Sequence, residues 1–473
     1  MDEVGERLAS VLVKRRGESN CMRNIIVLSL LLLQSCLGYG QKFEGTWQGE
    51  LKVQGVALPL VFHLENTTLW KGTMESPAQG NAKLPVSTIR IEQDSISITV
   101  ASIGLTYDGK LLPDGWIDGA VSQNGMTFPM RLSKAGHTLA KRRRPQLPEP
   151  PYSYDTLDVT FSSEYDNVKL AGTITRPREG EEMLPAVVLI SGSGPQDRDE
   201  TIMGHKPFKV IADYLTKQGI IVLRYDERGV GASTGNYPKS TIGDFSRDVI
   251  AAVGFIQKQE RVDPTRVGII GHSEGALIAE LIAGESSADI GFIGLLGAPA
   301  IPIDSLMVLQ AYEIGKLMGM SEKELQGAKE VNRRNFATVK SDLGDEHAYR
   351  QILENMSSPL PNLSDNQKDE IKMMVLPAYR YFMRIDPIPF IKRIDVPVFA
   401  AFGTKDVQVP FAPNLESLTD HLPKNEKNFL KAYDGLNHLF QKAETGAVSE
   451  YIDIEETFNE QVLSDLAQWI NDL

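Results

Sequence analysis

The stretch Val267-Gly-Ile-Ile-Gly-His-Ser-Glu-Gly-Ala-Leu-Ile-Ala-Glu-Leu-Ile282 decides the fold class of this chain. It begins with a short continuous apolar run, Val267–Ile270, which is typical of a strand buried on both faces of a parallel sheet. It then passes through Gly271-His-Ser-Glu-Gly275 into a helix-forming segment. A Gly-x-Ser-x-Gly turn between a strand and a helix exposes a serine hydroxyl above the sheet, and larger side chains would clash at its glycine positions. The flanking elements therefore predict an α/β fold with Ser273 as a nucleophile.

A second match to the same pattern, Gly231-Ala-Ser-Thr-Gly235, lies earlier in the chain. It leads into Asn236-Tyr-Pro238, and a helix cannot open there because proline disfavours the helical conformation of the residue before it. So short a pattern also arises by chance, so the flanking elements decide between the two matches. We predict that Ser233 is a loop serine.

From residue 152 onward, apolar runs alternate with helix-like segments. The runs predicted as buried strands are Ala186–Ile190, Ile220–Leu223, Val267–Ile270, Phe292–Leu296 and Val398–Phe402. The helix-like segments between them include Phe208–Gln218, Phe245–Gln259 and Ala276–Ala283. This alternation predicts a doubly wound, mostly parallel sheet with right-handed crossovers over residues 152–473. Between about residues 304 and 389 the pattern gives way to a mostly helical stretch rich in Met, Leu and charge, which predicts a helical cap inserted between two strands.

A serine nucleophile needs a general base, and the base needs a carboxylate that orients it. In this arrangement the three follow in the order serine, acid, histidine, each just beyond a strand. His438 lies in a loop after a strand-like segment, whereas His421 lies in a polar helical stretch that favours a solvated histidine. Asp406 directly follows Val398–Phe402, and Asp434 is the alternative acid, although its position is more typical of a turn. We predict His438 as the base and Asp406 as the orienting acid.

Acyl transfer also needs two donors for the oxyanion of the tetrahedral intermediate. One is the backbone N–H after the nucleophile, which is that of Glu274. The other is expected from Ser191-Gly-Ser-Gly-Pro195, whose small residues let the backbone approach a substrate. Ser193 is the predicted donor and Gly192 the next choice. Phosphate binding by this turn is disfavoured because no Gly-Lys-Ser/Thr follows it.

Residues 41–145 have the character of a small antiparallel β domain, a barrel or a sandwich. The segment Ser95–Val100 alternates apolar and polar residues, and Asp-Gly and Asn-Gly pairs separate short strands. Its tryptophans, Trp47, Trp70 and Trp116, are predicted as core residues, with a sugar-stacking face as the alternative. The prolines of residues 146–151 predict a semi-rigid linker, and the basic run Lys141–Arg144 before them is expected to be solvated.

Length and composition limit the class of protein. The 473 residues are too many for one ordinary domain and predict two or three folded units. The net charge of −13 gives no field that would attract phosphate backbones, which argues against nucleic-acid binding. The two cysteines, Cys21 and Cys36, lie near the N-terminus, so the rest of the chain has no disulfide, thiol nucleophile or Cys metal site.

The first 40 residues resemble a leader. The apolar run Ile25–Leu33 is too short to span a bilayer, follows Met22-Arg23 and ends in small and polar residues, as in a secretory signal peptide. We predict that translation starts at Met22, that cleavage follows Gly40, and that the protein is exported to the periplasm or beyond in a Gram-negative bacterium. The alternative is a lipoprotein anchored through Cys36.

The residues from 152 to 473 resemble the α/β-hydrolase superfamily, within it bacterial carboxylesterases that carry an extra N-terminal domain and a helical cap. The segments that carry the resemblance are Ser191–Asp199, Tyr225–Ser233, Gly271–Gly275, Gly403–Asp406 and Asn437-His438. The resemblance implies a catalytic triad of Ser273, Asp406 and His438, with Ser193 and Glu274 at the oxyanion hole. It implies hydrolysis of a small-molecule ester, in particular a short-chain acyl ester, through an acyl-enzyme, with neither metal nor organic cofactor.

Two other functions remain as alternatives. An exported serine peptidase of the prolyl-oligopeptidase type would use the same triad, but about one hundred residues without repeats cannot form the propeller usual in such peptidases. A non-catalytic carbohydrate-binding or envelope-scaffold protein would draw on the Trp-bearing β domain. The complete set of triad residues in the expected order favours the ester hydrolase over both.

Overall fold

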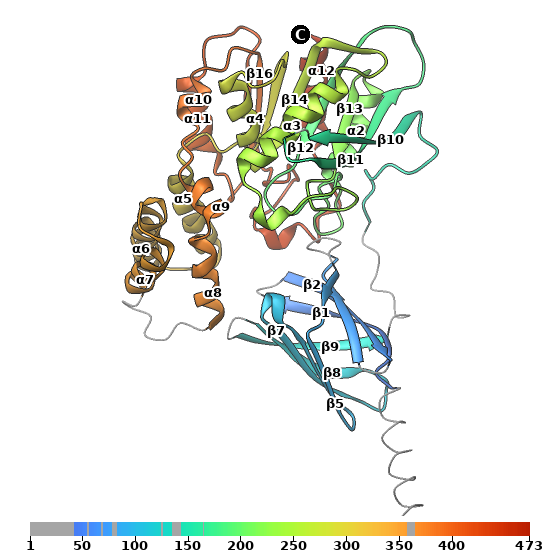
Figure 1. Ribbon diagram of the computed structural model, residues 1–473, viewed down its shortest axis with the longest axis vertical. Coiled ribbons are helices and arrows are strands. Elements are labelled where there is room, and N and C mark those ends of the chain that lie inside the picture. The colour runs from blue at the N-terminus through green and yellow to red at the C-terminus, as the bar shows by residue number, and fades with distance from the viewer. Residues whose placement is uncertain are drawn as a thin grey trace, which may run out of the picture. The chain divides into compact units, whose positions relative to one another are not determined.

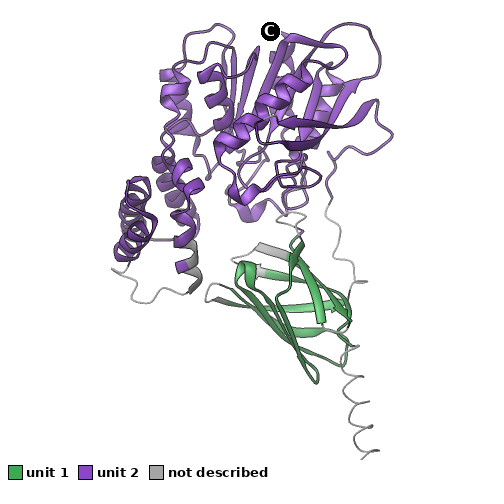
Figure 2. Ribbon diagram, viewed as in Figure 1, with its two compact units in different colours: residues 1–53, 57–76, 82–139 green, residues 54–56, 77–81, 140–473 purple. Residues whose placement is uncertain are grey.

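The computed structural model describes residues 42–53, 56–67, 70–77, 83–123, 126–134, 143–163, 165–356 and 365–473 (Figure 1). The predicted leader, with Met22 and Cys36, lies outside the described residues. The chain forms two compact units, and the strands β1 to β9 make up the first of them (Figure 2). The second contains the described residues from 143 onward. In these parts of the chain no helix combines the length and the apolar character that crossing a membrane requires.

The first unit is a nine-stranded antiparallel sheet in the order β4-β3-β2-β1-β9-β8-β7-β6-β5. Its elements are β1 (Gly45–Val53), β2 (Val56–Asn66), β3 (Trp70–Glu75), β4 (Lys83–Pro85), β5 (Thr88–Glu92), β6 (Ser95–Val100), η1 (Ala101–Ile103), β7 (Leu105–Leu111), β8 (Ile117–Gln123) and β9 (Met126–Lys134). The end strands β4 and β5 are consecutive in the chain, and Val86 between them donates a hydrogen bond to the Gly72 carbonyl of β3. The sheet therefore curls back on itself, as in a barrel.

The tryptophans of the first unit serve mainly packing. Trp47 is buried in the hydrophobic core of this unit and donates its indole N–H to the Phe43 carbonyl at 2.7 Å. Trp70 packs partly buried against the same core. Trp116 lies outside it, with the Arg131 guanidinium 5.1 Å from the centre of its ring. The core interpretation thus holds for two of the three, and they do not form one aromatic face.

The second unit contains an eight-stranded sheet in the order β10-β11-β13-β12-β14-β15-β16-β17. The strands are β10 (Tyr154–Ser163), β11 (Val168–Pro177), β12 (Leu184–Ile190), β13 (Ile221–Tyr225), β14 (Val262–His272), β15 (Phe292–Leu296), β16 (Val398–Gly403) and β17 (Phe429–Tyr433). β10 and β11 pair antiparallel, and every pair from β13 to β17 is parallel. Each apolar run predicted from the sequence lies in one of these strands, apart from Ile220, which directly precedes β13.

Helices cover both faces of this sheet. One core contains residues of α3 (Ile242–Ile256), α4 (Glu274–Glu285), α10 (Ile388–Ile391) and α11 (Phe411–His421), and the other contains residues of α2 (Pro207–Lys217) and α12 (Glu460–Asn471). Within β12, Val188 and Ile190 belong to the first core and Val187 and Leu189 to the second. Because both sets are apolar, the strand has a continuous hydrophobic sequence rather than an alternating one.

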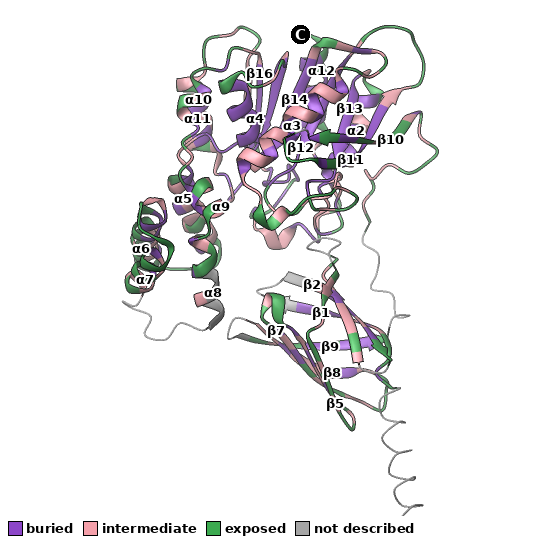
Figure 3. Cartoon of the chain, in the orientation of Figure 1, coloured by how far each residue is buried: buried purple, intermediate pink, exposed green. Residues whose placement is uncertain are grey.

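A helical insertion separates β15 from β16. It consists of α5 (Ile303–Leu317), α6 (Glu322–Lys340), α7 (Asp345–Met356), α8 (Asp365–Met374) and α9 (Pro377–Met383). Ser321 and Glu324 form a capping box that starts α6, since each side chain accepts a hydrogen bond from the other's backbone N–H. Much of α6 and α7 is exposed, in contrast to the buried strands (Figure 3). These helices run from residue 303 to residue 383, and the stretch expected from the sequence runs from about residue 304 to residue 389.

Arg144, the last residue of the expected basic run, and Gln146 of the expected linker are fastened to other parts of the second unit, whereas Lys141 and Arg142 lie outside the described residues. The Arg144 guanidinium donates hydrogen bonds to the carbonyls of Met203, Ile452 and Ile454. Gln146 exchanges hydrogen bonds with the Phe458 backbone, donating at 2.7 Å and accepting at 3.0 Å. Backbone carbonyls of irregular loops need donors, and these two side chains supply them, which a pattern of charge and proline does not reveal.

Candidate active site

The predicted site residues gather at one edge of the parallel sheet. Ile190 of β12 pairs with Gly271 of β14, and His272 pairs with Leu296 of β15. Farther along, Gly403 of β16 pairs with Tyr433 of β17. Because the carboxyl ends of parallel strands lie at the same edge, the loops that follow these strands meet there, which is where open α/β sheets bind ligands.

Ser273 occupies a strained turn between β14 and α4. Its φ of 55° lies in the left-handed region that non-glycine residues rarely adopt. A Cβ atom on Gly271 would lie 2.1 Å from the Gly275 carbonyl group, and one on Gly275 would lie 2.2 Å from the Ile190 oxygen. A larger residue at either position would therefore clash with backbone atoms, as the sequence pattern predicts. The turn leaves Ser273 partly exposed.

The serine of the other Gly-x-Ser-x-Gly match has a different place. The Ser233 hydroxyl donates to the Asp226 carbonyl at 2.6 Å and accepts from the Ala171 N–H at 2.9 Å. Its oxygen is thus used to hold a turn against β11. This is the position of a loop serine, as predicted.

Asp406 and His438 form a buried hydrogen-bonded pair. The His438 Nδ1 atom lies 2.7 Å from Asp406 Oδ2, and both side chains are almost completely buried. The other carboxylate oxygen, Oδ1, accepts the N–H groups of Gln408 and Val409, each at 2.8 Å. An ionised carboxylate only accepts, so Nδ1 carries the proton in the neutral ring and Nε2 is left free to take one.

Neither alternative residue enters this pair. His421 lies on α11, where its Nδ1 atom is 2.9 Å from the Ser417 carbonyl oxygen of the preceding turn. Asp434 accepts a hydrogen bond of 3.1 Å from the Thr404 hydroxyl. Both are therefore local structural residues, and the geometry favours Asp406 and His438.

The two predicted oxyanion donors differ in what surrounds them. Glu274 is the first residue of α4, where backbone N–H groups have no partner within the helix. The Gly192 N–H donates to Glu200 Oε1 at 2.8 Å and is therefore engaged. The next N–H belongs to Ser193, an exposed residue that lines the same cavity as Ser273. Between the two residues considered from the sequence, the geometry favours Ser193.

Acidic and basic side chains hold the loop that carries Ser193, and the sequence pattern assigned them no function. The Arg198 guanidinium donates two hydrogen bonds to the Asp226 carboxylate, at 3.0 and 2.9 Å. Glu227 accepts the Gln196 N–H at 2.8 Å. Burial raises the pKa of Glu227 well above its usual value, and nearby acidic groups reinforce this against the opposing Gln196 hydrogen bond. These contacts join the Ser193 loop to the segment Tyr225–Ser233.

A cavity of about 600 Å³ opens beside Ser273. Its polar lining includes Ser193 and Glu274, and burial raises the pKa of Glu274 to about 7. Its apolar lining includes side chains of α3 and of the helical insertion, among them Ile242, Phe245, Leu306, Met307, Met373, Leu376, Tyr379 and Phe382. The volume is in the range of sites that hold small molecules.

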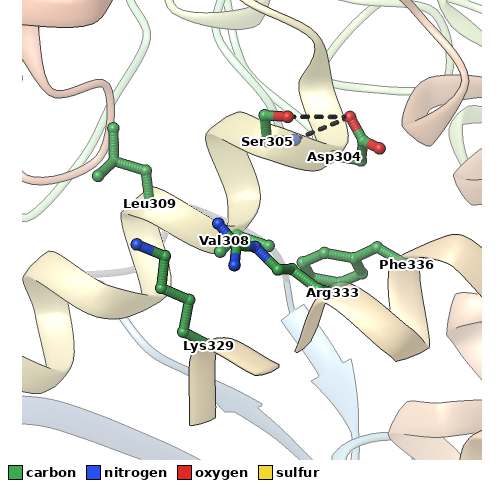
Figure 4. A pocket seen from close by; sticks show the side chains of 7 residues that line it. All are labelled: Asp304, Ser305, Val308, Leu309, Lys329, Arg333 and Phe336. Carbon is green, nitrogen blue, oxygen red and sulfur yellow. Dashed lines mark hydrogen bonds between the residues drawn. The ribbon is translucent and has the colours of Figure 1, made fainter. Parts of the chain in front are cut away.

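A second cavity, of about 380 Å³, lies within the helical insertion (Figure 4). Asp304, Ser305, Val308 and Leu309 of α5 line one side, and Lys329, Arg333 and Phe336 of α6 line the other. None of the predicted site residues borders it. The cavity beside Ser273 is therefore the candidate active site. In the described parts of the chain, no group of three His, Cys, Asp or Glu side chains is arranged to hold a metal ion.

The chain is similar to several known proteins. A family model described as serine aminopeptidase, S33, matches residues 205–351. Esterase EstD of Thermotoga maritima is 30% identical over 328 residues, which cover 69% of this chain and 70% of the esterase. The structure of the Pyrococcus furiosus esterase Pf2001 matches 71% of this chain and 99% of its own, with a TM-score of 0.42 and 18% identity. Est1E of Butyrivibrio proteoclasticus, with ferulic acid bound, matches 66% and 96%, with a TM-score of 0.40 and 15% identity.

The parallel sheet with a strained serine turn at its carboxyl edge defines an α/β-hydrolase. The similarity to EstD extends over more than two thirds of both chains at 30% identity. The chain therefore belongs to the esterase-like α/β-hydrolase family that includes EstD.

Proposed function

We propose that the protein is a serine hydrolase that cleaves carboxylic esters, in particular short-chain acyl esters, through an acyl-enzyme on Ser273. The observation that carries the proposal is the 2.7 Å hydrogen bond between Asp406 and His438 at the sheet edge where the Ser273 turn lies. Membership in the family of the esterase EstD supports the choice of an ester as the substrate. A base oriented by a buried carboxylate is what a serine needs to become a nucleophile.

Each residue has a separate role in the two steps of ester hydrolysis. His438 Nε2 takes the Ser273 hydroxyl proton as Oγ attacks the ester carbonyl carbon, and the Ser193 and Glu274 N–H groups stabilise the resulting oxyanion. The protonated His438 then gives its proton to the departing alkoxide, which leaves as the alcohol. Water repeats the cycle on the acyl-enzyme, with His438 again as base, and releases the carboxylic acid. Asp406 holds the imidazole in the required tautomer throughout.

The helical insertion between residues 304 and 389 is proposed to act as a cap. Residues of α5, α8 and α9 contribute apolar side chains to the cavity beside Ser273. Such a wall excludes water and encloses the acyl or alcohol group of the substrate. A cavity of about 600 Å³ suits a small ester better than a long-chain lipid that needs an open groove.

A serine peptidase is the second candidate, because the family model that matches residues 205–351 is described as a serine aminopeptidase. The same triad would attack an amide carbonyl, with His438 protonating the leaving amine. The nine-stranded sheet of the first unit is not a propeller of repeated blades. This leaves the prolyl-oligopeptidase type without its usual second domain and favours the ester hydrolase.

Export is proposed on the leader sequence alone. A charged residue, a short apolar run and a small-residue exit precede the first unit. Expression of the full chain in a Gram-negative host, followed by fractionation and N-terminal sequencing, should give a periplasmic protein that begins at Gln41. A cytoplasmic protein with its leader intact would contradict export, and a membrane-bound protein acylated at Cys36 would show the lipoprotein alternative.

The test of the enzymatic proposal uses the full chain, a Ser273→Ala variant and a matched Ser233→Ala variant. The substrates are p-nitrophenyl acetate, butyrate, octanoate and palmitate, with prolyl p-nitroanilide for the peptidase. We expect hydrolysis of the short esters that is lost in Ser273→Ala and retained in Ser233→Ala. Cleavage of the anilide without the esters would establish the peptidase. Activity that survives in Ser273→Ala would contradict both.

A further inference from the structure

A buried glutamate–histidine pair lies beside the predicted catalytic residues without lining the cavity. Glu200 is 4% exposed and His272 is 6% exposed. Their atoms Oε1 and Nδ1 are 2.9 Å apart, although the residues are 72 positions apart in the chain. Neither residue is among those that border the 600 Å³ cavity. The pair therefore acts through its neighbours and not by direct contact with a substrate.

Glu200 connects to the loop that carries the Ser193 N–H. The same Oε1 atom that faces His272 also accepts the Gly192 N–H at 2.8 Å. Gly192 packs closely here, since a Cβ atom on it would lie 3.3 Å from the Ser273 Cβ atom. Fixing the Gly192 N–H fixes the peptide immediately before the Ser193 N–H. Glu200 thereby sets the position of the predicted oxyanion donor relative to Ser273.

His272 connects to the loop that carries the predicted base. Its Nε2 atom lies 2.9 Å from the His438 carbonyl oxygen, and the two imidazole rings are 4.7 Å apart between centres. A carbonyl oxygen only accepts, so Nε2 must donate. Within the same loop, Asn437 Oδ1 accepts hydrogen bonds from the backbone N–H groups of Leu439 and Gln441. The backbone of His438 is thus tied to the residue directly before Ser273.

The protonation of the pair follows from its partners. Since Nε2 donates to a carbonyl and Nδ1 faces a carboxylate, the ring donates at both ends when Glu200 is ionised. Burial opposes a charged imidazole, but Glu200, the His438 carbonyl and Asp406 outweigh it and raise the pKa of His272. A charged ring and a carboxylate in contact compensate each other in the interior.

We propose that Glu200 and His272 are positioning residues that fix the Ser193 loop, the Ser273 turn and the His438 loop relative to one another. The inference rests on the proposed function of Ser273, His438 and Ser193. Three loops from different parts of the chain meet through the two side chains, and a displacement of about 1 Å in such a site can cost about 10²-fold in rate. The pair is therefore expected to control turnover more than substrate affinity.

The test compares Glu200→Ala with Glu200→Gln in the full chain. Alanine removes the acceptor of the Gly192 N–H and the partner of His272. Glutamine removes only the charge, because an amide oxygen in the place of Oε1 still accepts from the Gly192 N–H and from Nδ1–H of a His272 ring that is protonated at both nitrogens. Lys206→Ala is the matched control, since Lys206 contacts Asp199 of the same loop at 2.9 Å but touches neither member of the pair.

Turnover is normalised to the fraction of Ser273 labelled by a fluorophosphonate, so that unfolded protein does not count. In Glu200→Ala we expect kcat on p-nitrophenyl butyrate to fall about 10²-fold with little change in KM. Affinity for phenylboronic acid, which forms a tetrahedral adduct on serine, should fall in parallel. Glu200→Gln should recover most of the turnover, and Lys206→Ala should match the parent protein.

Hydrogen exchange gives a second readout that does not depend on activity. In Glu200→Ala, amide exchange should become faster both in residues 191–200 and in the distant residues 434–441. His272→Asn serves as a second variant if Glu200→Ala does not fold. The asparagine amide takes the place of Nδ1 beside Glu200, but the variant has no group that reaches the His438 carbonyl. Faster exchange in residues 434–441 is the expected result for that variant.

Several results would overturn the proposal. A labelled Glu200→Ala protein with the parent kcat and the parent boronic acid affinity would reduce the pair to a purely structural role. Faster exchange confined to residues 191–200 would show that the pair does not reach the His438 loop. If the parent protein neither hydrolyses esters nor labels at Ser273, the proposed function fails on its own, and the exchange of the two loops then decides whether the pair links them.

Discussion

Oδ2 of Asp406 accepts a hydrogen bond of 2.7 Å from Nδ1 of His438, across 32 residues of sequence. Asp406 follows β16 and His438 follows β17, two parallel strands that pair side by side. The second oxygen of Asp406 is held by two backbone N–H groups. The orientation of the carboxylate is therefore set by the backbone before any substrate arrives, which is the preorganisation that general-base catalysis needs.

The first prediction concerns this hydrogen bond. Asp406→Asn should lower kcat on p-nitrophenyl butyrate on the order of 10⁴-fold, because an amide can donate to Nδ1 and stabilise the wrong tautomer of His438. Asp434→Asn is the matched control and should stay within a few-fold of the parent, since Asp434 only accepts from the Thr404 hydroxyl. Equal losses in the two variants would argue against Asp406 as the orienting acid.

The second prediction concerns the glycines of the Ser273 turn. Gly271→Ala should prevent folding or destabilise the second unit severely, because the new Cβ would lie 2.1 Å from backbone atoms of Gly275. Gly254→Ala on α3 is the control: its Cβ would meet nothing within 4 Å, and alanine favours the helix by about 0.5–1 kcal/mol. Urea denaturation of both variants checks this. A soluble, fully stable Gly271→Ala protein would show that the turn is looser than the structure indicates.

The third prediction concerns substrate charge. Glu274 is the one carboxyl among the residues that line the described cavity, and burial raises its pKa to about 7. Above pH 7 it is ionised and should repel an anionic acyl group. The ratio of kcat/KM for p-nitrophenyl hemisuccinate to that for p-nitrophenyl butyrate should therefore fall roughly 10-fold as pH rises from 6 to 8. Glu274→Gln should remove this dependence, and a ratio that changes identically in both proteins would contradict the assignment.

The fourth prediction concerns stability at acidic pH. His205 is fully buried between Thr457 and the Tyr451 carbonyl, and burial together with nearby Arg144 lowers its pKa to about 4. The unfolded value is about 6.5, so the unfolded chain binds the proton first. Stability from the neutral ring is complete above about pH 6.5 and is lost as pH falls towards 4, by up to about 3 kcal/mol.

His205→Gln tests this, because its amide can still donate to the Tyr451 carbonyl but does not titrate. The free energy of unfolding, measured by urea at pH 7 and at pH 4.5, should fall less in the variant than in the parent protein. An unchanged difference between the two pH values would mean that His205 does not contribute to acid sensitivity.

Much of the fold could be predicted from local sequence. The apolar runs of β12, β14, β15 and β16 are continuous because helices cover both faces of their sheet, and that pattern is visible without a structure. The helical insertion was visible as the break in this alternation. The role of Arg144 and Gln146 was not visible, because their partners are backbone N–H and carbonyl groups more than 300 residues away or in another loop.

The candidate site divides in the same way. Ser273, Asp406 and His438 could be predicted because each follows a strand at a position where a local pattern signals the chemistry. Glu200 could not be predicted, because an isolated glutamate in a polar loop carries no local signal. His272 could not be predicted either, because it occupies a position of the Gly-x-Ser-x-Gly motif where any residue is allowed. The choice between Ser193 and Gly192 also needed the structure, because it depends on which N–H Glu200 engages.

The strand and helix periodicity, the strained serine turn and the order of serine, acid and histidine follow from local sequence patterns, because each depends on residues close together in the chain. The pairing of Glu200 with His272 and of Asp226 with Arg198 needs the three-dimensional fold, as does the choice of backbone groups that these side chains leave free. The physical reason is that a buried polar group must find a partner wherever the fold places one. That partner is fixed by how distant segments pack and not by the residues on either side.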